Sequence, residues 1–143
     1  YSNYYPGKSF LNRVCAFDCS ASKTSYSEGQ CFYINVGGDA SHNNYVNDSC
    51  ITNSINSATN SQYTQYVANG RIILTGENIS RNECHQYSAL YSSTPHSAYV
   101  AYCSFVNNTS NNIGCLLFNS PHEIHICNIL GNQQMSSSFQ SRN

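Results

Sequence analysis

The chain has 143 residues, of which 9% are charged, and its formal net charge at pH 7 is −1. This length suits one domain, and so weak a charge provides no electrostatic attraction to nucleic acid or to an anionic membrane surface. The longest apolar runs fall far short of the roughly 18 residues that suggest a membrane-spanning helix. We therefore expect no nucleic-acid partner and no membrane span in this chain.

The composition indicates an all-β protein. There are twelve tyrosines, no tryptophan and one methionine, and no window places apolar residues at helical spacing among good helix formers. The eight cysteines, an even number, indicate an oxidising compartment and hence an extracellular or cell-surface location. The alternative is an intracellular structural β-helix with reduced thiols, because free cysteine packs well in cores.

The first segment, YSNYYPGKSFLNRV, is aromatic and follows no repeat. We expect residues 1–14 to form an N-terminal cap or arm, because the open end of a stack of strands needs covering. The chain begins at Tyr1 without an initiator methionine, as a processed product or a fragment does.

A repeat then occupies residues 15–135, and its first two copies are weak. CAFDCS begins at Cys15, with Phe17 two positions later in a slot for a bulky apolar residue. CITNS begins at Cys50 and has Thr52 in that slot. Neither copy has the asparagine that ends the later ones.

Three clearer copies follow: ENISRN from residue 77, CSFVNN from residue 103 and CNILGN from residue 127. Their bulky apolar residues are Ile79, Phe105 and Ile129, and their asparagines are Asn82, Asn108 and Asn132. Successive copies are offset by 26 and 24 residues, which is the range of repeat lengths typical of solenoids.

The strand before each cysteine alternates inward and outward residues, and the alternation slips between Tyr102 and Cys103 and again between Ile126 and Cys127. Successive side chains of a straight strand must change face, so each slip predicts a bend between two strands. Short strands, bends and a constant period together predict a right-handed parallel β-helix of about five coils, with a period of about 24–26 residues. The competing fold is an antiparallel β-sandwich, which the Asn69-Gly70 turn signal permits.

In such a helix, equivalent residues stack at about 4.8 Å. We expect inward stacks of the bulky residues, an asparagine ladder at a corner, and stacked cysteines (Cys15, Cys50, Cys103 and Cys127). Cysteines in adjacent coils fall within the Cα–Cα range of a disulfide. The alternative is a ladder of reduced thiols. Glu77 occupies the cysteine position of its copy, and we expect a bulge to turn it outward because a buried acid is costly.

Residues 136–143 are predicted to be a C-terminal tail or a partial coil. Counting from the last asparagine, the next strand should begin at Phe139, so the chain stops within a coil. Either the protein was cut there or another copy completes the coil, and the second reading favours end-to-end self-association.

The stretch YVAYCSFVNNTSNNIGCLLF…EIHICNILGN resembles the trichomonad β-helix surface proteins, which are similar in layout to bacterial polymorphic outer-membrane proteins and to the pectate-lyase-like superfamily. The F-x-x-N element of these proteins corresponds to Phe105 through Asn108, and the copies at Ile79 and Ile129 are variants. The resemblance covers about residues 15–135. The chain lacks the G-G-A-[IL] element that often accompanies F-x-x-N in the bacterial family. It implies a secreted or cell-surface protein, without enzymatic activity, in adhesion or scaffolding.

We expect no catalytic residue, no metal and no cofactor. The acidic residues form no close pair of the kind used in glycoside hydrolysis, and the HEIH segment lies on a predicted strand rather than on the helix that a zinc motif needs. The alternative is a carbohydrate-active enzyme, a polysaccharide lyase or hydrolase on the same fold. It requires Asp18, Asp39, Asp48 or Glu77 to converge in one groove.

Two groups of surface residues complete the analysis. Asn47, Asn78 and Asn107 are glycosylation candidates in N-x-[ST] sequons, whereas Asn108 should be blocked inside the ladder. Tyrosines are the candidates for an exposed aromatic surface that binds glycans or host surface proteins (Tyr4, Tyr5, Tyr63, Tyr66, Tyr87, Tyr91 and Tyr99). The expected function is that of a non-enzymatic extracellular structural or adhesive module, able to assemble end to end into filaments.

Overall fold

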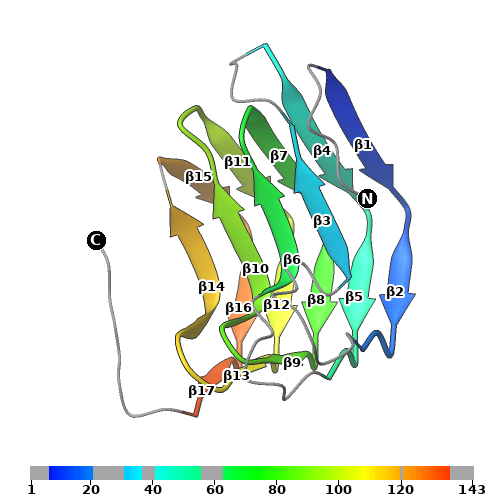
Figure 1. Ribbon diagram of the computed structural model, residues 1–143, viewed down its shortest axis with the longest axis vertical. Helices are drawn as coiled ribbons and strands as arrows, with labels where there is room; N and C mark the ends of the chain where they lie inside the picture. The colour runs from blue at the N-terminus through cyan, green and yellow to red at the C-terminus, as the bar shows by residue number, and fades with distance from the viewer. Residues whose placement is uncertain (1–6, 21–30, 37–40, 56–62, 120, 136–143) are drawn as a thin grey trace.

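The computed structural model describes residues 7–20, 31–36, 41–55, 63–119 and 121–135. Its strands pair only in the parallel sense and stack in coils along one axis, from the blue first coil to the orange-red last coil in Figure 1. The prediction of an all-β parallel β-helix is confirmed. Over the described ranges there is no helix long and apolar enough to cross a membrane.

The strands form four sheets, numbered I to IV in the order in which the chain visits them (Figure 1). Sheet I contains β1 (Lys8–Asn12), β4 (Asn43–Asn47), β7 (Arg71–Thr75), β11 (Ala98–Ala101) and β15 (His122–His125). Sheet II contains β2 (Cys15–Phe17), β5 (Cys50–Thr52), β8 (Asn78–Ser80), β12 (Ser104–Val106) and β16 (Asn128–Leu130). Sheet III contains β9 (Glu83–Cys84), β13 (Thr109–Ser110) and β17 (Gln133–Gln134). Sheet IV contains β3 (Phe32–Asn35), β6 (Tyr63–Ala68), β10 (Tyr87–Ser93) and β14 (Gly114–Asn119).

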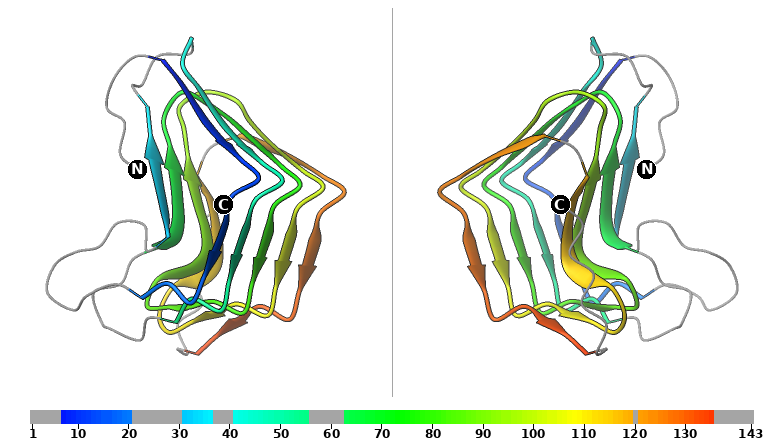
Figure 2. Two further views of the ribbon diagram at one scale, coloured as in Figure 1. Left: turned by 90° about the vertical axis from the view of Figure 1, so that its right-hand side faces the viewer. Right: turned by 90° about the vertical axis from the view of Figure 1, so that its left-hand side faces the viewer.

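The number of coils differs from the predicted five. Three turns, starting at β4, β7 and β11, have all four sides, although in the first of these the isolated pairing of Ile55 with Glu83 stands in for a strand of sheet III. Within the described residues the turns at either end lack one side. Figure 2 shows the nested outlines of the coils, with sheet IV on one side and sheet II opposite. Contacts between equivalent residues span 35, 28, 26 and 24 residues along the chain, so the coils shorten toward the end.

The corners between sheets I and II and between sheets II and III are made by single residues in the left-handed backbone conformation. At the first corner these are Arg13, Asp48, Gly76, Tyr102 and Ile126, and at the second they are Asp18, Asn53, Arg81, Asn107 and Gly131. The bends predicted after Tyr102 and Ile126 are confirmed. A left-handed residue reverses the alternation of faces without a loop, which explains why the apolar pattern slips by one residue at that point.

The core consists of in-register rows of apolar side chains, one row for each sheet position. Ile51, Ile79 and Phe105 are paired neighbours in sheet II, and each is at most 1% exposed. Ile129 continues the row but is 51% exposed, because it belongs to the last described coil. Stacking of the coils therefore buries apolar side chains that a single coil would leave exposed.

Two expectations about the first coils are corrected. β1 lies within the segment predicted to be a cap, yet it pairs with β4 as the first strand of sheet I, so the described residues 7–14 belong to the first coil. Cys50 pairs with Asn78 rather than aligning with Glu77. The early copies are thus shifted by one residue, which moves side chains to the opposite face.

The shift changes which residues point inward. Ala16 and Ile51, rather than Phe17 and Thr52, occupy the apolar row, and Phe17 is 62% exposed. Cys15 and Cys50 form a disulfide across sheet II, with a Cα–Cα distance of 4.5 Å. They are therefore not in the stack that contains the cysteines of the later coils.

Candidate functional site: a tyrosine face on sheet IV

Five tyrosines lie side by side on sheet IV in two rows. In the first row Tyr33, Tyr66 and Tyr91 are register partners, and their rings stack at 4.8 and 5.0 Å with interplanar angles of 7° and 3°. In the second row Tyr63 stacks on Tyr87 at 5.5 Å and 8°. We call these five residues the tyrosine face.

The two rows touch each other, so the face is continuous. Tyr63 lies 4.6 Å from Tyr91 and 5.1 Å from Tyr66, and Tyr87 lies 5.6 Å from Tyr91, all measured between ring centroids. Aromatic pairs at these separations favour one another beyond the area that they bury. All five rings are half-buried, which leaves part of each accessible.

A register irregularity makes the two rows possible. Tyr63 and Tyr66 are three residues apart, an odd spacing that puts side chains on opposite faces of a regular strand. Between them Thr64 and Gln65 are both buried, and the pairing of β6 with β10 shifts register in the same place. The shift returns Tyr66 to the outer face beside Tyr63.

The strands that carry the tyrosine face are uncharged within the described residues. The four strands of sheet IV read FYIN, YTQYVA, YSALYSS and GCLLFN, and none contains an aspartate, glutamate, lysine or arginine. Such a surface offers aromatic area and hydroxyl groups but no ionic attraction.

The structure brings together four of the predicted tyrosines, Tyr63, Tyr66, Tyr87 and Tyr91. Sequence reasoning missed Tyr33, because its distance of 33 residues from Tyr66 departs from the repeat period. Tyr99 lies elsewhere, on sheet I, with its ring 5.3 Å from that of His125. The remaining two candidates, Tyr4 and Tyr5, lie outside the described residues.

The asparagines named as ladder rungs form hydrogen bonds from coil to coil. Asn82 donates its backbone N–H to Asn108 Oδ1 at 3.1 Å, and Asn108 donates its own to Asn132 Oδ1 at 3.0 Å. Each side-chain amide donates to the carbonyl oxygen of the apolar residue one coil earlier, as Asn108 does to Ile79 at 2.9 Å. The earlier coils use Ser54, whose N–H donates to Asn82 Oδ1.

The sequon asparagines differ in exposure. Asn78, the first residue of β8, and Asn107, a corner residue after β12, are both exposed. Asn47 is half-buried and accepts a hydrogen bond from Thr75 Oγ1 at 2.7 Å. Asn108 is fully buried. Glycosylation at the three candidates stays a prediction.

The three acidic residues of the catalytic alternative that the structure describes do not share a groove. Asp18 and Asp48 are exposed at different corners, where Asp18 accepts a hydrogen bond from Asn53 at 2.6 Å. Glu77 points into the core, and Asp39 lies outside the described residues. In the described ranges no three side chains of the histidine, cysteine or carboxylate type group in a way that could hold a metal ion.

The expectation that a bulge turns Glu77 outward is wrong. It is 2% exposed and accepts a hydrogen bond from Gln65 Nε2 at 2.9 Å. Burial raises the pKa of its carboxyl from 4.5 to about 8, although the bond from Gln65 acts in the opposite direction. The acid is tolerated inside because it is largely protonated at neutral pH.

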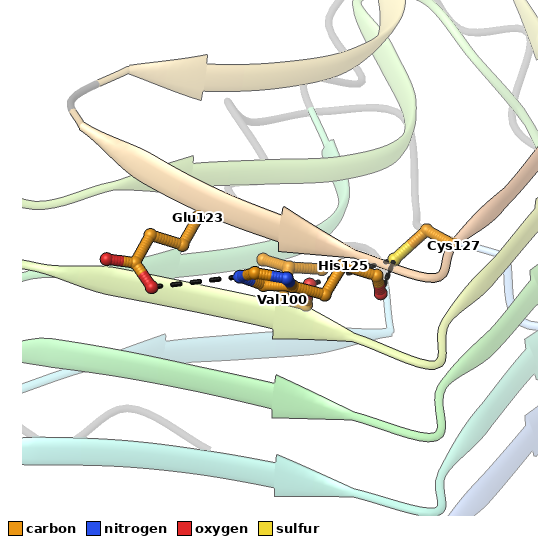
Figure 3. A network of polar contacts seen from close by, with 4 residues as sticks. All are labelled: Val100, Glu123, His125 and Cys127. Carbon is orange, nitrogen blue, oxygen red and sulfur yellow. Dashed lines mark hydrogen bonds and ion pairs between the residues drawn. The ribbon is translucent and has the colours of Figure 1, made fainter.

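The later cysteines lie in the same corner position as Glu77. Burial, and then the proximity of Glu77, raise the pKa of the Cys103 thiol to about 12. In the next coil the Cys127 thiol donates to the carbonyl oxygens of His125 at 3.4 Å and Val100 at 3.7 Å, and Glu123 lies 3.7 Å from His125 Nε2 (Figure 3). Cys103 and Cys127 carry free thiols in this structure.

The fold and its surface define a parallel β-helix with an uncharged tyrosine face on one sheet. Comparison of the chain with protein-family models, with curated proteins and with solved structures gives no match. The resemblance to trichomonad surface proteins therefore stays a prediction.

Proposed function

We propose that this protein is a non-enzymatic structural and adhesive module of the extracellular space or cell surface, and that the tyrosine face is its adhesive surface. The observation that carries the proposal is the continuous contact of five tyrosine rings on one sheet. Tyrosine is enriched at binding interfaces because it combines a large apolar ring with a polar group. Glycans and host surface proteins are the partners that this proposal includes.

The packing of the solenoid supports an adhesive role. Stacked rings on a hydrogen-bonded sheet have few rotamers to lose on binding, so less conformational entropy opposes the contact. The carbohydrate-active enzyme of the alternative needs converging carboxylates, and the described candidates point into the core or toward different corners. The geometry therefore favours adhesion over catalysis.

Adhesion can be tested with beads that carry the protein, applied under flow to epithelial monolayers. We expect the double variant Tyr66→Ser, Tyr91→Ser to lose at least about tenfold in bound beads, because each removed ring takes with it roughly 1–3 kcal/mol of apolar contact. Tyr99→Ser, on sheet I, is the matched control and should bind as the unmodified protein does. Equal adhesion of all three proteins, or none above albumin-coated beads, contradicts the proposal.

The proposed module also assembles end to end into filaments. Its last described coil presents an apolar surface of Ile124, Ile129, Leu130 and Met135, which are 43%, 51%, 63% and 69% exposed. Strands β15 and β16 are the edges of sheets I and II, and edge strands template the addition of a further strand.

We expect the weight-average sedimentation coefficient to rise with protein concentration, and we expect Ile129→Asp to abolish the rise because it places a charge on the contact. Phe17→Asp, at an outward-facing apolar position of the first coil that is 62% exposed, is the control and should leave the rise unchanged. A monomeric boundary at every concentration would contradict assembly.

A further inference from the structure

The second tyrosine row stops one coil before sheet IV does. The register partner of Tyr87 in β14 is Gly114, which has no side chain. A Cβ atom built at Gly114 would meet no other atom within 4 Å. The first row, by contrast, continues from Tyr91 to Leu117. The surface therefore has a gap above Tyr87, with Gly114 as its floor and Leu117 beside it.

The spacing of the second row would place one more ring over Gly114. Tyr63 and Tyr87 stack at 5.5 Å with nearly parallel planes, and the next strand along the axis lies at about 4.8 Å. A six-membered ring placed over Gly114 would thus continue the stack on Tyr87 at the same step. The backbone of Gly114 does not compete for this ligand, since its N–H donates to Gln86 O at 3.2 Å and Ser110 Oγ at 3.0 Å.

Two polar residues in contact with each other precede the strands that border the gap. His85 and Asn112 precede Tyr87 and Gly114 by two residues each, and His85 Nε2 lies 3.4 Å from Asn112 Nδ2. Each of the two side chains can exchange hydrogen bonds with a hydroxyl group. The strands of sheet IV contain no charged residue, and the neighbouring carboxylate of Glu83 already accepts a hydrogen bond from Asn111 Nδ2 at 3.2 Å. The sheet itself therefore favours neither an anion nor a cation.

A pyranose ring matches this combination. Its C–H bonds on one face carry partial positive charge, which the negative face of an aromatic ring attracts, and its hydroxyl groups lie at the rim. We propose that the gap above Tyr87 at Gly114 is a binding site for one sugar ring of a neutral oligosaccharide. This inference rests on the proposed adhesive function and names the ligand class of the same face.

The test fills the gap. Gly114→Tyr extends the second row by one ring, and we expect it to weaken binding of immobilised neutral oligosaccharides at least about tenfold. Gly7→Tyr is the matched control, because an added Cβ at Gly7 also meets no atom within 4 Å. Circular dichroism and thermal unfolding establish that both variants fold. The probes are hexasaccharides of glucose, galactose, mannose and N-acetylglucosamine, with sialylated oligosaccharides as charged counterparts.

A second pair of variants covers the case in which Gly114→Tyr does not fold. Tyr87→Phe keeps the ring and should retain most binding, whereas Tyr87→Ser removes the stacking surface and should lose it. Absence of binding to every neutral probe, equal binding of Gly114→Tyr, or preference for sialylated probes overturns the inference. Bead adhesion that persists in Gly114→Tyr while Tyr66→Ser, Tyr91→Ser abolishes it overturns the sugar site alone. If beads that carry the unmodified protein do not adhere, the proposed adhesive function itself is overturned.

Discussion

Replacing Glu77 by glutamine is expected to stabilise the fold at alkaline pH and to remove most of its pH dependence. The carboxyl is 2% exposed, and burial raises its pKa from 4.5 to about 8. Its Oε2 is buried without a hydrogen-bond partner. Ionising this group inside the β-helix therefore costs free energy that an uncharged amide does not.

The direction of the effect follows from proton binding. Between pH 4.5 and about 8 the folded protein holds the Glu77 proton and the unfolded chain releases it. Stability then falls as pH rises across this interval and levels off above it. Each unit of pKa difference corresponds to about 1.4 kcal/mol, so the loss is a few kcal/mol.

Urea denaturation at pH 5, 7 and 9 measures this. We expect the midpoint of the unmodified protein to fall with pH and that of Glu77→Gln to stay nearly constant, with the two closest at pH 5. The glutamine keeps an oxygen to accept the hydrogen bond from Gln65. Glu123→Gln, an exposed acid whose side chain is 78% accessible, should leave the pH dependence of the unmodified protein unchanged. Parallel curves for Glu77→Gln and the unmodified protein would show that the buried acid does not set the pH dependence.

Asn108→Ala is expected to destabilise the fold by about 3–5 kcal/mol, because buried polar groups left without partners cost roughly 1–3 kcal/mol each. The Asn108 side chain accepts from Asn82 twice, at 3.0 and 3.1 Å, and donates to Ile79 O and to Asn132 Oδ1 at 2.9 Å. Alanine removes all four bonds and leaves the buried backbone N–H of Asn82 without its acceptor in the core.

The neighbouring residue supplies the control. Asn107 is exposed and left-handed, with φ 54°, and glycine adopts that conformation without strain. Asn107→Gly should therefore change stability by less than about 0.5 kcal/mol, as surface substitutions usually do. Asn132→Ala should cost less than Asn108→Ala, since Asn132 is only half-buried. Equal midpoints in urea for Asn107→Gly and Asn108→Ala would contradict a stabilising ladder.

The fold could be predicted because stacking in register imposes one set of offsets on every coil. Phe105 and Ile129 lie at the same offset from their asparagines, and they pair in adjacent strands. The sequence repeat is misaligned by one residue in the early coils, where Ser54 takes the place of the asparagine in the ladder. One residue of error at Cys50 then reversed the assignment of inward and outward side chains in the first two coils.

Glu77 and Tyr33 could not be placed from sequence for a different reason. The partner of Glu77 is Gln65, which lies on another sheet and whose inward position accompanies the register shift between β6 and β10. Tyr33 joins its row across a coil of irregular length. Both depend on contacts between coils that the local pattern does not contain.

The spacing within the coils is uneven in a way that has a practical consequence. Eight residues separate the inward residue of sheet I from the ladder position in every coil, whereas whole coils differ in length by up to eleven residues (Leu11 to Cys19, Val46 to Ser54, Leu74 to Asn82, Val100 to Asn108 and Ile124 to Asn132). All variation in length thus falls on the return path through sheets III and IV. Foreign peptides, such as epitopes or affinity tags, are best grafted into that path, where coils of different length already share the same spacing through sheets I and II.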